Sequence, residues 1–140
     1  MSEIIHTNQE VGEEVVKNVN IGFDDFLKVK MAVGKVLSAE KVEGSPKLLK
    51  LSVDFNEKEE EKNEAGETVM NNKPRQVLSG IAKTFLPEDL IEKSFVFVIN
   101  LEPRSIMGME SRAMILAGSD EQGLVLFSPT REIQSGTTLG

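Results

Sequence analysis

Short apolar runs, each about as long as one strand and separated by turn residues, limit this chain to a β-rich fold. Residues 47–55, "KLLKLSVDF", alternate apolar and polar side chains, which is the period of a half-buried strand. The next strands are predicted at residues 75–81, "RQVLSGI", and at residues 94–101, "SFVFVINL". The second of these runs is continuously apolar and of strand length, so we expect it to be buried.

The first long strand is expected at residues 29–42, before the turn "EGSP" at 43–46. Residues 29, 31 and 33 would share one face, and Ala32, Gly34 and Val36 the other. Gly34 lies in mid-strand, where glycine marks a bulge or a sharp bend of a barrel. This strand is therefore predicted to be long and bent.

Helices are expected only as short pieces. Asp24 or Asp25 can cap a turn that directs Phe23, Phe26 and Leu27 inward, and Pro87 begins "PEDLI", a helix start with acidic residues in its first turn. Within residues 1–22 the sequence allows at most a short helix around 13–17.

Two more strands at 112–119 and 124–129 flank the turn "DEQG", and residues 134–140 can add a last one. The pattern predicts an all-β protein with short helices. A five-stranded OB-fold barrel with extra C-terminal strands fits this order best, and such barrels bind oligonucleotides or oligosaccharides on one face. Periodicity alone does not separate a barrel from a sandwich.

The net charge of −7 over 140 residues comes from two segments. Residues 1–22 carry four glutamates and one lysine, and residues 56–72 carry six glutamates and two lysines, while the remainder is neutral. Both segments are rich in charge and poor in apolar residues. We interpret 1–22 as a flexible acidic tail or linker, 23–140 as the folded domain, and 56–72 as an acidic, mobile loop inserted between the second and third strands.

The residue inventory argues against several kinds of site. The chain has no Cys, and its one His, His6, lies in the N-terminal segment, so neither a zinc site nor a Ser-His or Cys-His centre is expected in the domain. The pair Asp24 and Asp25 is a helix cap rather than an acid/base pair. We therefore expect no catalytic residues, no metal and no cofactor. Without a signal peptide or a membrane-length apolar run, we also expect a cytoplasmic chain that does not engage a membrane.

Five collinear stretches carry a family resemblance. They are "DDFLKVKMAVGKV", "EGSPKLLKLSVD", "RQVLSGIAK", "PEDLIEKSFVFVINLEPRSIMGMESRAMILAG" and "LFSP". They resemble the tRNA-binding OB domain that is appended to methionyl-tRNA synthetases and recurs in cytokine-type and free-standing tRNA-binding proteins. The resemblance covers some 100 residues from about Phe23 onward. It implies an OB fold, tRNA as a partner, a homodimer, and an association with a synthetase catalytic domain.

The resemblance also implies where RNA would bind. The stretch "NLEPRSIMGMESRAM", residues 100–114, would form a strand end and loop at the barrel rim, where amides, hydroxyls and guanidinium groups meet an RNA backbone. It departs from the family at Ser105 and Met107, where basic residues are usual, so tRNA binding is expected to be weak, and the acidic loop should lower it further. The candidate tRNA-binding residues are Lys47, Arg75, Ser79, Lys83, Asn100, Arg104, Ser111 and Arg112.

Simpler interpretations stay open for these residues. A single Lys or Arg is common on any surface, Ser79 and Gly80 can form a turn, and Asn100 can cap backbone groups. With no Trp or Tyr, stacking on aromatic rings is a weak mechanism, and recognition of RNA shape and backbone is favoured. The alternative function is a dimerisation or protein-interaction module, chaperone-like, with little RNA affinity. In either case the chain can be a non-catalytic part of a methionine–tRNA ligase, so whether it belongs to an enzyme stays open.

Overall fold

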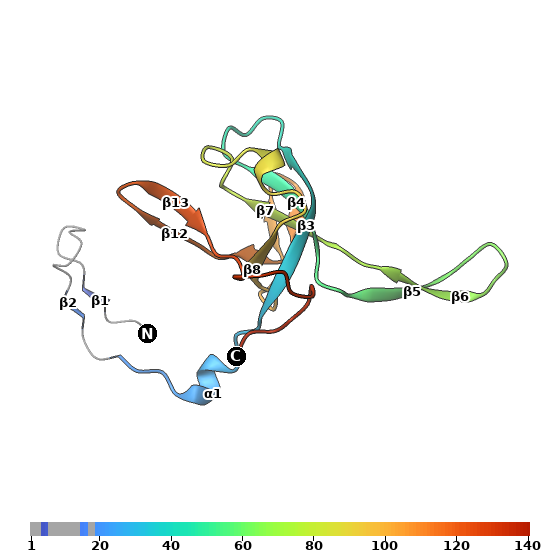
Figure 1. The fold of residues 1–140 in the computed structure, drawn as a ribbon, viewed down its shortest axis with the longest axis horizontal. Helices are drawn as coiled ribbons and strands as arrows, with labels where there is room; N and C mark the ends of the chain where they lie inside the picture. The colour runs from blue at the N-terminus through green and yellow to red at the C-terminus, as the bar shows by residue number, and fades with distance from the viewer. Residues whose placement is uncertain (1–3, 6–14, 17–18) are drawn as a thin grey trace.

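The computed structural model describes residues 4–5, 15–16 and 19–140, and its body is a nearly closed antiparallel barrel (Figure 1). Five strands form the barrel sheet in the order β11-β8-β3-β4-β7. Their bounds are β3 Met31–Lys41, β4 Leu49–Asp54, β7 Arg75–Ser79, β8 Ser94–Val98 and β11 Met114–Ile115. The predicted all-β class and five-stranded barrel are confirmed.

The barrel core follows the alternation seen in the sequence. On β4 the side chains at 49, 51 and 53 are buried while those at 50, 52 and 54 are half-buried. The ring of Phe55 meets that of Phe97, from β8, edge to face at 5.2 Å between centroids. These residues form one apolar cluster with Val36, Val77, Leu90 and Ile115. Burial of this cluster is the main favourable contribution to folding.

Strand β3 is long and bent, as predicted, and it pairs with β8 along its first half and with β4 along its second. The register shift lies between Val36 and Ser38, not at Gly34. Gly34 is needed for space: a Cβ there would lie 2.5 Å from Cε1 of Phe55 and 2.5 Å from Cγ1 of Val53. The bend therefore brings β3 so close to the core that only glycine fits.

The C-terminal residues run beside the start of β3. Val33 N donates to Thr137 O at 2.9 Å, Gly136 N donates to Val33 O at 2.8 Å, and Ala32 forms a single bridge with Thr138. This segment thus pairs with the edge of β3 that lies opposite β8. Ala32 and Val33, at the start of β3, are both buried. The last strand expected from the sequence is thus an isolated bridge.

Three hairpins extend the barrel. They are β5 Lys58–Lys62 with β6 Thr68–Asn72, β9 Arg104–Ile106 with β10 Met109–Ser111, and β12 Ala117–Asp120 with β13 Gly123–Leu126. The β5–β6 and β12–β13 hairpins project to opposite sides of the barrel in Figure 1. The β12–β13 hairpin confirms the two strands expected around the turn "DEQG", although β11 splits off from the first of them.

The acidic insertion differs from the expectation of a loop. It lies between β4 and β7, as predicted, but its residues form the β5–β6 hairpin with Glu60 opposite Met70. Two strands pair through backbone hydrogen bonds, which need no alternation of apolar side chains. A charge-rich segment can therefore form a hairpin that its side-chain pattern does not predict. Whether the hairpin moves as a unit stays a prediction.

The N-terminal segment contains a short α1, Phe23–Phe26, and a pair of two-residue strands, β1 Ile4–Ile5 and β2 Val15–Val16. The prediction of a short helix around 13–17 is wrong for residues 15–16, which form β2. Residues 13, 14 and 17 lie outside the described residues. The other undescribed residues of the predicted tail are 1–3, 6–12 and 18.

The expected cap and packing of α1 are also wrong. Gly22 is the N-cap residue, without a side-chain cap bond, and Asp25 instead pairs with Lys28 at 3.0 Å. Phe23 is 71% exposed, and Phe26 and Leu27 are exposed as well, because the barrel does not cover this helix. The helix start at Pro87 is confirmed as a single 3-10 turn, η1 Pro87–Asp89. The described residues include no helix of the length and apolarity needed to cross a membrane.

Candidate nucleic-acid interface

Two loops and one hairpin meet at one end of the barrel, and we call this surface the rim: residues 42–48, residues 79–84 and the β9–β10 hairpin. The first two loops are joined by a hydrogen bond of 2.9 Å from Ala82 N to Lys47 O. A Cβ on Gly44 would lie 3.6 Å from Cε of Met107, which places the hairpin beside the first loop. Ser79 and Arg104 line one small hollow of about 70 Å³. Lys47, Ser79, Lys83 and Arg104 therefore belong to one surface.

The β9–β10 hairpin turns at Met107 and Gly108, whose φ angles are 51° and 78°. Two successive residues with positive φ make the type of turn that matches the twist of a two-residue hairpin. The strand end and loop that the sequence predicts within residues 100–114 form a regular hairpin, with Ser105 opposite Glu110. The sequence does not predict this turn, because a methionine rarely adopts a positive φ.

Three of the candidate cations lie on the surface of the rim. Lys47, Lys83 and Arg104 are exposed. Over residues 19–140 none of the three takes part in an ion pair or a side-chain hydrogen bond. Their charges are thus available to an anion at the rim.

Two of the polar candidates serve the barrel itself. Ser111 is 7% exposed; its hydroxyl accepts a hydrogen bond from Leu78 N at 3.0 Å and donates to Ala113 O at 3.2 Å. Asn100 accepts from Lys30 N at 2.9 Å and donates to Lys28 O at 2.7 Å. The backbone-cap interpretation of Asn100 is therefore the one its geometry supports, and the hydroxyl of Ser111 closes β10 onto β7.

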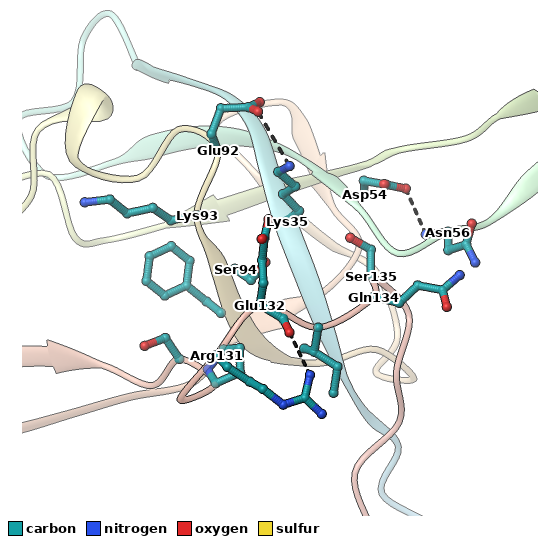
Figure 2. A pocket seen from close by; sticks show the side chains of 14 residues that line it. Lys35, Asp54, Asn56, Glu92, Lys93, Ser94, Arg131, Glu132, Gln134 and Ser135 are labelled. Atoms are coloured by element: carbon teal, nitrogen blue, oxygen red, sulfur yellow. Dashed lines mark hydrogen bonds and ion pairs between the residues drawn. The ribbon is translucent and has the colours of Figure 1, made fainter.

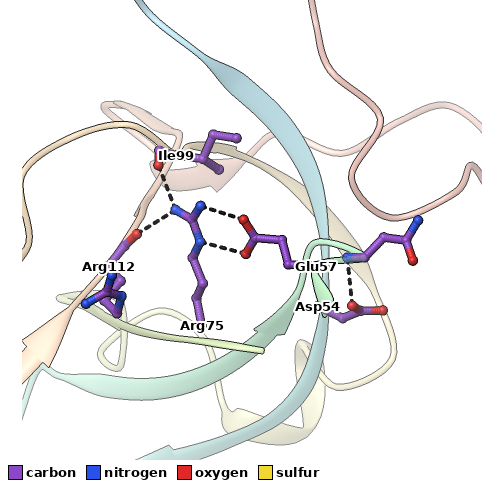
Figure 3. Close-up of polar contacts among 6 residues, drawn as sticks. Asp54, Glu57, Arg75, Ile99 and Arg112 are labelled. Carbon is purple, nitrogen blue, oxygen red and sulfur yellow. Dashed lines mark hydrogen bonds and ion pairs between the residues drawn. The ribbon is translucent and has the colours of Figure 1, made fainter. Parts of the chain in front are cut away.

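Arg75 is committed to internal contacts (Figure 3). Its Nε and Nη2 donate to the two carboxylate oxygens of Glu57 at 2.8 and 2.7 Å. Its Nη1 donates to Ile99 O at 2.6 Å and to Arg112 O at 3.0 Å, and the guanidinium lies 5.5 Å from the centroid of the Phe55 ring. Four of its five N–H donors are occupied. Arg75, which the family resemblance implies as an RNA contact, therefore joins the base of the hairpin to the barrel wall.

Arg112 holds an intermediate position. Its backbone N donates to Gln76 O at 2.9 Å, which helps to close the barrel, while its guanidinium pairs with Glu110 at 2.6 Å in an exposed ion pair. Two further lysines that sequence reasoning did not select, Lys58 and Lys73, line the same groove as Arg75 and Arg112. Their position in a glutamate-rich segment masked them.

A separate hollow of about 540 Å³ lies between β3, β8 and residues 128–135 (Figure 2). Basic and acidic side chains alternate around it: Lys35, Lys93, Arg131, Asp54, Glu92 and Glu132. Lys35 faces Glu92 at 3.6 Å. None of the candidate tRNA-binding residues lines this hollow, and its balanced charge gives an anion no preference for it.

The chain was compared with known proteins. A family model described as "Putative tRNA binding domain" matches residues 31–138. The chain belongs to this tRNA-binding domain family. Among curated proteins, methionine–tRNA ligases of Methanothrix thermoacetophila and Campylobacter jejuni are each 39% identical over 134 residues, which cover 96% and 94% of this chain. The chain spans only 18% and 19% of those two relatives.

Two solved structures share the fold of this chain. A methionyl-tRNA synthetase related protein from Pyrococcus horikoshii has a TM-score of 0.71 at 34% identity, covering 87% of this chain and 99% of that one. The chaperone CsaA from Bacillus anthracis has a TM-score of 0.67 at 28% identity, covering 87% of this chain and 100% of that one. Both relatives span almost the same length as the tRNA-binding domain described above.

Proposed function

We propose that this domain binds tRNA at the rim, through phosphates of the RNA backbone and through the shape of the folded RNA. The observation that carries the proposal is the group of three exposed cations, Lys47, Lys83 and Arg104, which make no ion pair within residues 19–140. They lie on two adjoining loops and the neighbouring hairpin. The hydroxyl of Ser79 adds a hydrogen-bonding group at the same surface.

Backbone recognition suits the composition of the rim. The chain has no Trp or Tyr, and Phe95 and Phe97 are buried in the core. Stacking of bases on these two rings is therefore excluded. The exposed Phe23, Phe26 and Phe127 lie outside the rim, so electrostatic contacts would carry the binding at the rim. With few phosphate contacts, the affinity should be modest, and the slope of log affinity against log salt should be modest as well.

The domain would work in the cytoplasm as an appendage of a methionyl-tRNA synthetase or as a free-standing homologue of one. Its matches to two ligases at 39% identity support the first arrangement, and the Pyrococcus relative of nearly equal length supports the second. In the first case the catalytic domain is its partner, and this domain gives that enzyme additional hold on tRNA.

A homodimer is part of the proposal. The family resemblance implies it, and Leu101 and Met107 in the stretch 99–109 are exposed apolar side chains. A larger apolar surface lies on residues 19–29, where Ile21 is 66% exposed and Leu27 and Val29 are exposed beside Phe23. A second copy of this chain is the occupant that the family resemblance implies, and its docking would remove this surface from water.

The same apolar surface supports the second candidate function, a dimerisation or protein-interaction module with little RNA affinity. The likeness to a chaperone at 28% identity agrees with it. The unpaired rim cations favour RNA binding over this alternative.

Fluorescence anisotropy with bulk tRNA, at about 50 and 200 mM salt, tests the proposed function. The triple variant Lys47→Gln, Lys83→Gln, Arg104→Gln should bind at least about tenfold more weakly at low salt, with a shallower salt slope. A matched control removes three exposed charges away from the rim, with Lys28→Gln, Lys62→Gln and Arg131→Gln. Equal losses in both triple variants, or no binding by the wild type, would support the protein-interaction module instead.

A further inference from the structure

The base of the β5–β6 hairpin differs in charge from its outer part. Glu60, Glu61, Glu64 and Glu67 lie on the outer part, whereas Lys58 and Lys73 lie where the hairpin joins the barrel. A backbone hydrogen bond of 2.9 Å from Lys73 N to Glu57 O extends the ladder to this base. The bidentate contact of Glu57 with Arg75 then ties the base to β7.

A groove of about 610 Å³ runs between the hairpin base and residues 99–103. Its apolar lining comes from Pro74, Ile99, Leu101 and Pro103. Its charged lining consists of one carboxylate and four cations, namely Glu57, Lys58, Lys73, Arg75 and Arg112. A surface with excess positive charge beside an apolar wall is suited to a phosphate that carries a sugar and a base.

The cations of the groove are not equally committed. Arg75 is fixed by Glu57 and two carbonyl groups, as Figure 3 shows. Lys73 pairs with Glu59 at 2.9 Å, and Arg112 pairs with Glu110, but both pairs are about half-exposed, and exposed ion pairs contribute little. Lys58 contacts the side-chain oxygen of Asn72, which is neutral. A phosphate can therefore replace the partners of Lys58, Lys73 and Arg112 at small cost.

The groove adjoins the rim. Leu101 lines both the groove and the hollow that contains Ser79 and Arg104, and Arg112 directly follows Ser111 of β10. An extended RNA backbone at the rim can thus reach the groove without crossing the barrel.

We propose that Lys58, Lys73 and Arg112 form a second contact for a backbone phosphate of the same tRNA, beyond the rim. This inference rests on the proposed function. It assigns the hairpin two opposing effects: its basic base attracts the RNA, while its acidic outer part repels it and Glu59 competes for Lys73. The hairpin would thereby set the affinity of the domain for tRNA.

Single lysine variants measure the contact. In tRNA anisotropy titrations, Lys58→Gln and Lys73→Gln should each lower affinity at low salt by roughly three- to tenfold and reduce the salt slope by about 0.7 to 0.9. Lys62→Gln removes the same charge at the far end of β5 and should change affinity less than about twofold. If Lys62→Gln weakens binding as much as the other two variants do, the general field of the hairpin acts and the groove holds no phosphate.

Two glutamate variants that change the net charge by the same amount make a second comparison. Glu59→Gln frees Lys73, whereas the side chain of Glu60 contacts no cation within residues 19–140. Glu59→Gln should therefore tighten tRNA binding more than Glu60→Gln does. Equal tightening by the two variants would overturn the assignment of Lys73.

The rim variants separate this inference from the proposed function. Loss of binding in the Lys47, Lys83 and Arg104 triple variant, with unchanged binding in Lys58→Gln and Lys73→Gln, overturns the groove and leaves the rim. Absence of wild-type binding removes both. Binding of ATP, measured in the same variants, distinguishes a free nucleotide from tRNA as the ligand. If ATP binding depends on Lys58 and Lys73 while tRNA affinity does not, the groove is a nucleotide site instead.

Discussion

Glu57 accepts two hydrogen bonds from the guanidinium of Arg75, at 2.8 Å from Nε and 2.7 Å from Nη2. The pair is half-buried, with side chains 38% and 21% exposed, and it connects the acidic hairpin to the third barrel strand. Because Arg75 also donates to the carbonyl of Ile99, it supports the barrel wall rather than an RNA phosphate.

Arg75→Lys should therefore destabilise the domain without a specific loss of RNA contacts. A lysine cannot reproduce the planar fork, and it leaves the Ile99 and Arg112 carbonyls without a donor. We expect the free energy of unfolding to fall by about 1–3 kcal/mol in urea titrations. Arg104→Lys, at an exposed position, is the control and should stay within about 0.5 kcal/mol of wild type. Equal stabilities of the two variants would show that the Arg75 contacts contribute nothing.

Gly34→Ala should be strongly destabilising. The new Cβ would lie 2.5 Å from Phe55 Cε1 and from Val53 Cγ1, so β3 or the ring must shift. Overpacking of this kind costs about 1–3 kcal/mol, which thermal unfolding followed by circular dichroism can resolve. Gly80→Ala is the matched control, because no atom lies within 4 Å of a Cβ at that position. A melting temperature equal to that of Gly80→Ala would contradict the close approach.

Ser111→Ala should lower stability by about 1–2 kcal/mol, since Leu78 N would lose its acceptor in the barrel wall. The effect on tRNA affinity, measured at a temperature where the variant is fully folded, should be small. Ser119→Ala, on the exposed β12 strand, serves as the reference. A large loss of affinity at full folding would instead assign Ser111 to the RNA contact that the family resemblance implies.

Ser105→Lys combined with Met107→Arg should tighten tRNA binding and steepen the salt slope by about one or two units. Both positions are exposed on the rim hairpin, and Met107 already has positive φ, so arginine adds no new backbone strain. The control places the same charges on the distal hairpin with Ser119→Lys and Gln122→Arg. If only the control pair tightens binding, the rim is not the RNA surface.

Phe23→Glu should weaken the proposed homodimer. Replacing an aromatic side chain at an interface by a charged one weakens the free energy of association by about 2 kcal/mol or more, which raises the dissociation constant roughly 30-fold. Light scattering at tens of micromolar would show a shift from dimer to monomer. Phe127→Glu changes another exposed phenylalanine, at the end of the β12–β13 hairpin, and should leave the mass unchanged. A wild type that is monomeric at this concentration would remove the dimer from the proposal.

The sequence by itself determined the barrel strands. The alternation at Leu49, Leu51 and Val53 and the apolar run around Phe97 specify which faces are buried, because burial of apolar side chains acts on local patterns. It also indicated a constraint at Gly34. The order of these elements favoured the OB fold over other all-β folds, and the family motifs indicated a tRNA-binding domain.

Only the tertiary structure decided which polar residues are free. Arg75 and Arg104 are both arginines at motif-matched positions, yet one is held by Glu57 and two carbonyl groups while the other is exposed. Likewise, Phe23 is an aromatic residue that the sequence pattern predicts to be buried, but it lies where no part of the barrel covers it. Ion pairs and covered surfaces arise from residues distant in the chain, and a local pattern does not encode which distant groups become partners.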